Sequence, residues 1–464
     1  MVSQHLVSRN FQGIHHAWII DNVPGRGALT CEQLSGIRQV FIHCQWVRAQ
    51  IIIFGSPDHE SDFKTRGDTV MFDLAAAQSA IQEQGLDGWL LYDFRGSNPL
   101  ASRILGTSDH HVTRRWFYFV PAQGSPIKLV HRIEASVLDH LPGERKIVYL
   151  RWEELEAGVR EMIGRMNRIA MEYSPRNANP YLSRVDAGTV ELVRSFGPEI
   201  VSSGDLIQQF EATWDDEQWR MHLAAAEQTD AAFGIAWAFI SQQIRERGRT
   251  SETAVQQRIL EHFAVHGLLT DHPPIVAVWE HSGDPHFSPS LATDKAIEPG
   301  SFVLIDLWAK LAQPRAVYSD LTRVAYVGET VPAKVNEIFR IVAEARDAAI
   351  DRIVRAFAAG DPIQGWQVDF TCRDVIEQAG YGDFFVHRTG HSIGQEIHGN
   401  GANMDSLETR EERRVMRRTC FSIEPGIYLP EFGVRSEVNV FIDPAGKVHV
   451  TGGDRQTEVR RILL

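Results

Sequence analysis

The sequence predicts an α+β protein in which a smaller domain precedes a larger one, and two observations support this class. Between residues 71 and 207, short apolar runs alternate with helical segments, a pattern typical of an α/β domain. From residue 215 onward, long helical segments separate strand-like runs, which is typical of an α+β arrangement. We therefore expect three segments, at residues 1–70, 71–210 and 211–464.

Residues 1–70 differ from the rest of the chain. They contain one lysine, Lys64, two of the four cysteines, and no regular helical or strand period. The stretch 59–68 is charged and resembles a linker. We interpret residues 1–70 as a disordered extension or as the product of a non-native start, with Met71 as the natural start of the folded protein.

Residues 71–210 are expected to form short buried strands with helices between them. A helix is predicted at 72–85 from its apolar spacing and terminal glycine. The strand-like runs are Trp89–Phe94, Trp116–Pro121, Ile127–His131, Ile147–Trp152 and Ile169–Tyr173, and a further helical segment is Trp152–Met166. No glycine-rich phosphate loop follows any of these runs, so this segment indicates no chemistry of its own.

Residues 211–464 are expected to contain four helices. The acidic turn 215–217 opens the first, which extends to about Arg247. The others are expected at Thr250–Gly267, Pro332–Ala359 and Trp366–Ala379, and the strand-like runs are Phe302–Trp308, Leu321–Val327, Cys420–Leu429 and Val434–Ile442.

Composition excludes several classes of protein. The chain has 464 residues, and 47 basic against 60 acidic side chains give a net charge of −13, which disfavours nucleic-acid binding. The four cysteines form no C-x-x-C pair, so neither a disulfide framework nor a thiolate zinc site is indicated. The longest apolar stretch, Val40–Phe54, is too polar to span a membrane, and no signal peptide is evident. We expect a cytoplasmic protein without nucleic-acid or membrane partners.

Four acids and one histidine stand out in the larger segment. The acids Asp306, Asp320, Glu424 and Glu437 lie in runs that otherwise resemble buried strands, and His391 lies in a glycine-flanked segment. A buried carboxylate is costly unless it is paired or bound to a metal. No matching lysine or arginine is apparent in the same core, so the four acids point to divalent cations. Oxygen and nitrogen ligands without a thiolate suit Mn²⁺, Co²⁺ or Zn²⁺.

The motifs that carry these residues resemble those of the pita-bread metallopeptidases, a family that includes Xaa-Pro aminopeptidases, Xaa-Pro dipeptidases (prolidases), methionine aminopeptidases and creatinase. The motifs are IDLWAK, SDLTRVAY, TGHSIGQEIH, SIEPGIY and GVRSEV, in the family's order. The preceding residues resemble the amino-terminal domain of the creatinase–prolidase branch. The resemblance therefore covers about residues 71–464, and it implies a pita-bread catalytic domain after an α/β domain.

The resemblance also implies a role for each ligand. Asp320 and Glu437 would bridge two metal ions. Asp306 would complete one ion, and His391 with Glu424 the other. The nucleophile would be a water activated by both ions, with Glu424 as its general base.

Four further residues match family positions near the substrate. His398 would contact the substrate and steady the tetrahedral intermediate. His286, in GDPHFSP, would lie near the scissile peptide, although without the motifs a surface loop is the better interpretation. Arg435 and Tyr428 would line the pocket, bind substrate and support the ligands, and simple packing remains open for both.

Two departures from the family pattern affect the inference. Asp306 and Asp320 are 14 residues apart, about three more than is usual, and the extra residues fall in the turn 312–319. Val438 stands where the family commonly has an acid, and strand alternation would point it away from the metals. The pair His110-His111 is interpreted as a loop, and the basic segment 410–418 as solvated surface.

The leading hypothesis is a two-metal peptidase, with Mn²⁺ favoured, that cleaves the Xaa-Pro bond. A prolidase-like dipeptidase is favoured over an Xaa-Pro aminopeptidase acting on longer peptides, and a homodimer is expected from the two-domain relatives. A non-catalytic binding protein and a metal-independent hydrolase of the creatinase type are the alternatives. Both typically lose metal ligands, whereas this chain keeps all five. The preferred Xaa residue stays open.

Overall fold

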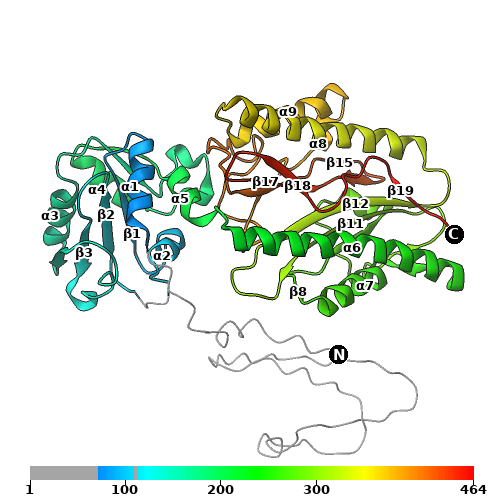
Figure 1. Ribbon diagram of the computed structural model, residues 1–464, viewed down its shortest axis with the longest axis horizontal. Helices are drawn as coiled ribbons and strands as arrows, with labels where there is room; N and C mark the ends of the chain where they lie inside the picture. The colour runs from blue at the N-terminus through cyan, green and yellow to red at the C-terminus, as the bar shows by residue number, and fades with distance from the viewer. Residues whose placement is uncertain (1–71, 109–111) are drawn as a thin grey trace, which may run out of the picture. The chain divides into compact units, whose positions relative to one another are not determined.

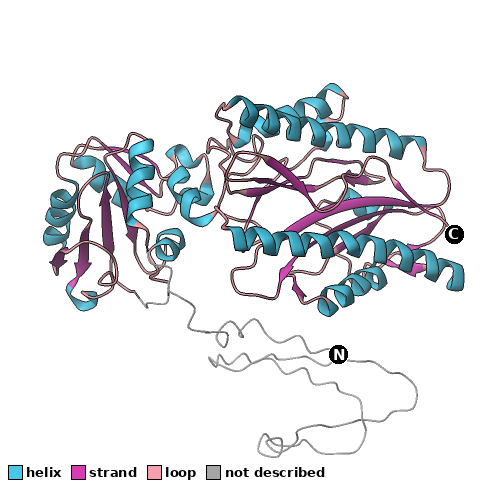
Figure 2. Cartoon of the chain, viewed as in Figure 1, coloured by secondary structure: helices cyan, strands magenta, loops and turns pink. Residues whose placement is uncertain are grey.

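The structure is a computed structural model that describes residues 72–108 and 112–464 (Figure 1). The interpretations of residues 1–70 and of His110-His111 therefore lie outside the described residues. Figure 2 shows both helices and strands, as the α+β prediction expects. Among the described helices, none has the length and apolar character needed to cross a membrane.

A six-stranded sheet occupies residues 88–202, in the order β4-β3-β2-β1-β5-β6. Its strands are β1 (Gly88–Asp93), β2 (Trp116–Pro121), β3 (Ile127–His131), β4 (Arg145–Tyr149), β5 (Arg168–Met171) and β6 (Glu199–Ser202). The helices around it are α1 (Leu74–Glu83), α2 (Pro99–Ile104), α3 (Trp152–Ile163), α4 (Ala187–Ser195) and α5 (Gly204–Glu211). The β1–β2 and β2–β3 pairs are antiparallel, and the other pairs are parallel.

The predicted strand Ile147–Trp152 extends too far, because β4 ends at Tyr149 and α3 begins at Trp152. The Glu154 carboxylate accepts hydrogen bonds from the backbone N–H groups of Leu150 and Arg151, which starts α3 at Trp152. A glutamate at the third helical position is a common helix-start signal. This side chain therefore converts the end of an apolar run into a helix.

The rest of the chain places two pairs of helices around a five-stranded and a four-stranded sheet. The helices are α6 (Asp216–Arg247), α7 (Glu252–Val265), α8 (Ala333–Ala359) and α9 (Gly365–Gln378). One sheet has the order β19-β12-β11-β8 with β9 also paired to β11, and the other has the order β13-β14-β17-β18. Figure 1 shows these strands between α6 and α7 on one side and α8 and α9 on the other. Each helix pair shares a hydrophobic core with the sheet that it covers.

The strands of this part are short except for one hairpin. Its two strands, β11 (Phe302–Leu311) and β12 (Ser319–Val327), exceed the predicted runs at both positions. The other strands are β7 (Thr250–Ser251), β8 (Leu268–Leu269), β9 (Ile275–Val278), β10 (Ala296–Ile297), β13 (Ser392–Ile393), β14 (Cys420–Ile423), β15 (Gly426–Tyr428), β16 (Gly433–Arg435), β17 (Val438–Ile442), β18 (Val448–Thr451) and β19 (Arg460–Ile462).

Two predicted strands are each broken in the structure. The run Cys420–Leu429 divides into β14 and β15 at Glu424-Pro425, and the run Val434–Ile442 divides into β16 and β17 at Ser436-Glu437. Pro425 has no N–H to give to a ladder, which explains the first break. At the second, the Glu437 N–H leaves the strand pairing and donates to the Thr322 carbonyl. Glu424 and Glu437 therefore lie between strands rather than within them.

Candidate metal centre

The β11–β12 hairpin places two acids on one face of its sheet. Asp306 lies opposite Thr322, and Trp308 lies opposite Asp320. Directly opposed residues of an antiparallel pair point to the same side, and so do residues two apart on one strand. Asp306 and Asp320 therefore share a face, and the longer connection between the strands does not change that.

The two strand breaks bring two further acids to the same place. The Glu424 N–H donates to the Thr389 carbonyl, and the Ser422 hydroxyl donates to Glu424 Oε1 at 3.0 Å. The Thr322 hydroxyl donates to Glu437 Oε2 at 2.8 Å. Each carboxylate is thus held through one oxygen, which leaves the other available to a ligand.

His391 is fixed by a close backbone approach. A Cβ added to the neighbouring Gly390 would meet the Ser422 carbonyl oxygen at 1.9 Å, so only glycine fits there. The His391 N–H donates to the Ser422 hydroxyl, and its Nδ1 lies 3.2 Å from the Ser392 carbonyl oxygen. Because a carbonyl only accepts, Nδ1 carries the proton. The Nε2 lone pair is therefore free to bind a cation.

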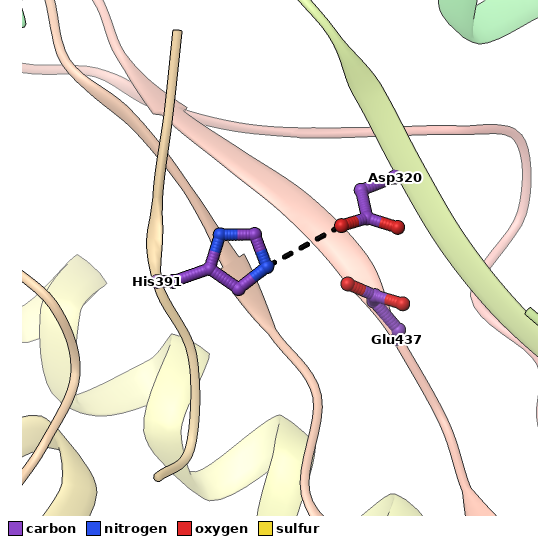
Figure 3. A group of neighbouring side chains, drawn as sticks. All are labelled: Asp320, His391 and Glu437. Atoms are coloured by element: carbon purple, nitrogen blue, oxygen red, sulfur yellow. Dashed lines mark ion pairs between the residues drawn. The ribbon is translucent and has the colours of Figure 1, made fainter. Parts of the chain in front are cut away.

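Asp320, His391 and Glu437 meet within a few ångströms (Figure 3). Each offers one ligand atom, and these atoms lie within 4.8 Å of one another. His391 Nε2 lies 3.3 Å from Asp320 Oδ2 and 3.4 Å from Glu424 Oε1. All three side chains are buried, so the cluster concentrates negative charge where water cannot screen it.

The cluster has the electrostatics of a cation site. Burial, and then the charge of Asp306, raise the pKa of Asp320 well above its usual value. Burial and the charge of Asp320 do the same to the pKa of Glu437. Asp306 Oδ1 and Glu437 Oε1 are buried without a hydrogen-bond partner. Orphaned carboxylate oxygens facing like charges are what a divalent cation would satisfy, so these residues fit the predicted metals.

One acid has a basic partner that the sequence analysis did not find. Arg435, only 4% exposed, donates through Nη2 to Asp306 Oδ2, and its Nε donates to the Thr322 hydroxyl. The expectation of buried acids without a matching base is therefore wrong for Asp306. Four carboxylates still surround one guanidinium, so the excess of negative charge remains.

Arg435 also connects to a residue that the sequence analysis missed, His387. Arg435 Nη1 donates to the Tyr428 hydroxyl, which lies 2.7 Å from His387 Nε2. Since the hydroxyl accepts from Arg435, its own proton goes to Nε2. His387 Nδ1 then donates to the Arg388 carbonyl oxygen at 2.7 Å. The sequence signal for a role of His387 was its position four residues before His391. Its partner Tyr428 lies 41 residues away, so the sequence could not show that the two residues meet.

A cavity of about 630 Å³ opens onto the cluster. All five predicted ligands line it, together with the predicted residues His286, His398 and Arg435. The His398 ring packs edge-on against His391, with centroids 4.3 Å apart. Tyr428 is buried behind Arg435, so its hydroxyl reaches the site through that guanidinium. Val438 packs in the hydrophobic core, away from the ligands.

Comparisons with known proteins give one family model and relatives named as peptidases. A model of metallopeptidase family M24 matches residues 220–444. The putative dipeptidase YkvY of Bacillus subtilis is 30% identical over 284 residues, which are 60% of this chain and 72% of that protein. An Xaa-Pro dipeptidase of Lactobacillus delbrueckii subsp. lactis is 33% identical over 214 residues, which are 46% of this chain and 52% of that protein. The chain thus spans about half the length of that relative.

Solved structures agree with the fold. Dipeptidase PepE from Mycobacterium ulcerans superposes with a TM-score of 0.60 and 23% identity, covering 86% of this chain and all of that one. An Xaa-Pro dipeptidase from Bacillus anthracis superposes with a TM-score of 0.51 and 23% identity, covering 84% of this chain and 99% of that one. The predicted fold class, a pita-bread domain after an amino-terminal domain, is confirmed.

Proposed function

This chain belongs to metallopeptidase family M24, and we propose that it hydrolyses the peptide bond of Xaa-Pro substrates, with dipeptides favoured over longer peptides. The observation that carries the proposal is the buried cluster of four carboxylates and one imidazole on the wall of the cavity. The names of two relatives supply the substrate class, since one is a putative dipeptidase and the other an Xaa-Pro dipeptidase.

The proposed metal ligands are Asp306, Asp320, His391, Glu424 and Glu437, with Asp320 and Glu437 shared between two ions. Such ions, when bound, polarise a peptide carbonyl and make water a stronger acid. Five ligands exceed what one catalytic ion with an open position needs. We favour Mn²⁺, because oxygen donors outnumber the single nitrogen donor.

Glu424 is the proposed general base. Its side chain is 15% exposed, and it faces the cavity while Ser422 holds one of its oxygens. Burial raises the pKa of Glu424 in the metal-free protein. It would take the proton of the attacking water and return it to the leaving proline nitrogen.

His398 is the proposed group that steadies the developing oxyanion. The neighbouring His391 and burial lower the pKa of His398 to about 3. The imidazole is therefore neutral at pH 7 and can donate from one ring nitrogen without bringing a positive charge close to the metals. His286, exposed on the cavity wall, is proposed to lie near the scissile peptide.

Arg435 and Tyr428 are proposed to support the ligands more than to bind substrate. The guanidinium of Arg435 is occupied by Asp306, Thr322 and the Tyr428 hydroxyl. It fixes the orientation of Asp306, and Tyr428 in turn fixes Arg435. We further propose a cytoplasmic location, with which the free buried thiols at Cys372 and Cys420 are consistent. A homodimer is proposed as well, from the resemblance to two-domain relatives. Size-exclusion chromatography with light scattering measures the oligomeric state.

The test begins with protein stripped by a chelator, to which Mn²⁺, Co²⁺ or Zn²⁺ is added back. Hydrolysis of Leu-Pro should be absent without metal and should rise to its maximum at two ions per chain. Leu-Gly and Leu-Pro-Gly-Gly are the comparison substrates. Full activity at one ion per chain would contradict the shared roles of Asp320 and Glu437. A preference for the tetrapeptide would instead indicate an Xaa-Pro aminopeptidase.

Glu424→Gln tests the general base. The variant keeps the size of the side chain but removes the proton acceptor, so kcat should fall at least ~10²-fold. Glu412→Gln is a matched control, because the Glu412 side chain is 67% exposed at the surface. A near-normal kcat in Glu424→Gln, with folding unchanged by circular dichroism, would refute the assignment.

A further inference from the structure

The six-stranded sheet of the amino-terminal domain has a pocket at one of its edges. Because β2 runs antiparallel to β1 and β3, and β4 runs parallel to β3, the strands β1, β3 and β4 all end at the edge where β2 begins. A pocket of about 610 Å³ opens there, and its lining residues lie between Tyr92 and Thr189. Among the described residues, none lines both this edge pocket and the cavity of the metal centre.

The edge pocket lies where open α/β sheets commonly bind a ligand. In the order β4-β3-β2-β1-β5-β6, the strands after β1 extend to one side of it, and β5 and β6 lie on its other side. Ligands of such sheets bind outside the carboxyl ends of the strands, where the direction of winding changes. Helices α3 and α4 also begin at this edge, at Trp152 and directly after Asp186, and both residues line the pocket. The positive end of a helix dipole favours an anion.

A buried imidazole offers an N–H group without a partner to the edge pocket. His131 ends β3, is 9% exposed and lines the pocket. The Ile133 N–H donates to His131 Nδ1 at 3.1 Å, so the proton of the neutral ring is on Nε2. Among the described residues, none accepts a hydrogen bond from this Nε2. The ring packs edge-on against Tyr149, with centroids 4.9 Å apart. A fixed and buried donor of this kind indicates a missing acceptor.

Two arginines give the edge pocket a positive charge. Arg115, half-buried, and Arg114, exposed, line it just before β2. Among the described residues, no carboxylate lies within ion-pair distance of either guanidinium. Asp186 is the one acid among the described lining residues, and it already accepts from the N–H and the hydroxyl of Thr189. The lining therefore keeps an excess of positive charge that an anion would neutralise.

Aromatic and apolar side chains form the rest of the wall. Phe94, Leu150 and Trp152 line the edge pocket, although between 42% and 63% of each side chain is exposed. Tyr92 and Tyr149 are buried behind them, in the core that the sheet shares with α3 and α4. Exposed aromatic surface beside a guanidinium suits a flat ring, which stacks on the aromatic faces.

We propose that the edge pocket binds a small organic anion in which a carboxylate or a phosphate is joined to a planar ring. Arg115 and the Nε2–H group of His131 bind the oxyanion, to which a guanidinium can donate two parallel hydrogen bonds. The ring lies against Trp152 and Phe94. This site gives the amino-terminal domain a binding function beyond the proposed peptidase activity, and it does not depend on that activity.

Isothermal titration calorimetry of the full chain tests the site with two probes. AMP carries a phosphate and indole-3-acetate carries a carboxylate, and each joins its oxyanion to a planar ring. We expect at least one of them to bind at one molecule per chain with a Kd below about 1 mM. Inorganic phosphate, acetate and adenosine supply only one half of the recognised group, so they should bind at least ~10-fold more weakly. The probe that binds more tightly identifies the oxyanion.

Three variants and a control assign the binding to the edge pocket. Arg115→Gln removes the charge that binds the oxyanion, so Kd should rise about 10- to 100-fold. Trp152→Ala removes the stacking surface and should raise Kd about 5- to 50-fold. His131→Phe keeps a ring but removes the Nε2–H group, so Kd should rise about 3- to 10-fold. Arg145→Gln is the matched control, at a 54% exposed arginine of the same sheet outside the pocket, and should leave Kd unchanged.

The outcomes separate this inference from the proposed function. Binding should be equal in a chelator and in Mn²⁺, because none of the five proposed metal ligands lines the edge pocket. Binding that requires Mn²⁺ would overturn the proposal, and so would wild-type protein that binds neither probe, even if it hydrolyses Leu-Pro. If Arg115→Gln or His131→Phe does not fold, the exposed site Trp152 decides, and an unchanged Kd in Trp152→Ala overturns the proposal.

Discussion

Glu437→Gln should stabilise the metal-free protein. Glu437 is 1% exposed, its Oε1 has no hydrogen-bond partner, and the charges of Asp320, Glu424 and Asp306 act on it. An unsatisfied buried polar group costs about 1–3 kcal/mol, and more when charged. Glutamine has the same shape, keeps an oxygen for the Thr322 hydroxyl, and offers an N–H₂ group to the neighbouring carboxylates. We expect a gain of about 1–3 kcal/mol in the free energy of unfolding.

The pH dependence of this gain has a definite sign. The folded pKa of Glu437 is raised above its unfolded value of 4.5, so the wild-type residue is tolerated below pH 4.5, where both states are protonated. Its contribution to stability is then lost as pH rises through the folded pKa. The advantage of Glu437→Gln should therefore be small near pH 4.5 and grow toward higher pH.

Thermal unfolding followed by circular dichroism provides the assay. For a domain of this size, about 1–3 kcal/mol corresponds to roughly 3–10 °C in Tm. In a chelator, Glu437→Gln should melt above wild type. In Mn²⁺ at ~1,000 times Kd the order should reverse, because the metal then stabilises wild type by about 4.1 kcal/mol and the variant has lost a proposed ligand. Glu412→Gln is the surface control. A variant that melts below wild type in the chelator would refute the reasoning.

Three other predictions concern residues around the site. His387→Phe should lower kcat/KM about 5- to 10-fold in steady-state assays, because the Tyr428 hydroxyl loses its acceptor. An unchanged kcat/KM would show that the hydrogen bonds from His387 through Tyr428 and Arg435 do not position Asp306. Burial lowers the pKa of His222 to about 4, so the stability that its neutral form contributes is lost as pH falls below 6.5. Denaturant titrations should show a free energy of unfolding about 2 kcal/mol lower at pH 5 than at pH 7, and His222→Gln should lack this difference. A chain that begins at Met71 should fold, bind metal and hydrolyse Leu-Pro, and aggregation of that chain would contradict the interpretation of residues 1–70.

The helices of the larger segment were predictable because their ends carry local signals. Asp215 accepts hydrogen bonds from the N–H groups of Glu217 and Gln218, and Gly248 ends the same helix in the left-handed conformation. Acidic first turns and terminal glycines are visible in sequence. The bounds predicted for α6 and α8 therefore lie within one residue of those observed.

The strand breaks at Glu424 and Glu437 were not predictable from apolar character. The strands on both sides of each break are buried, and one long buried strand has the same apolar pattern as two short ones. Pro425 was a usable signal, because proline is rare in central strands. For Glu437 the decisive contact is with Thr322, more than a hundred residues away, and no local pattern reports it.

The residue types in the sequence predicted which side chains lie close together, but not which acid is paired with which base. The five proposed ligands were predicted from acids in apolar runs and from motif order, and the structure places all five residues on one cavity. The pairing of Arg435 with Asp306 and the position of Arg388 beside Tyr181 both join distant segments. Their geometry depends on how the sheets and loops pack, and spacing along the chain carries no such information.

The longer turn between Asp306 and Asp320 is tolerated because the ladder that positions them ends before it. The last pair of the ladder is Ala309 with Ser319, and the extra residues lie beyond that pair. The register is also held from outside the hairpin, since the Asp320 N–H donates to the Asn439 side chain at 3.0 Å. Any change of turn length that keeps these pairs keeps both acids on one face. A change confined to the turn therefore leaves Asp306 and Asp320 on the same face of the sheet.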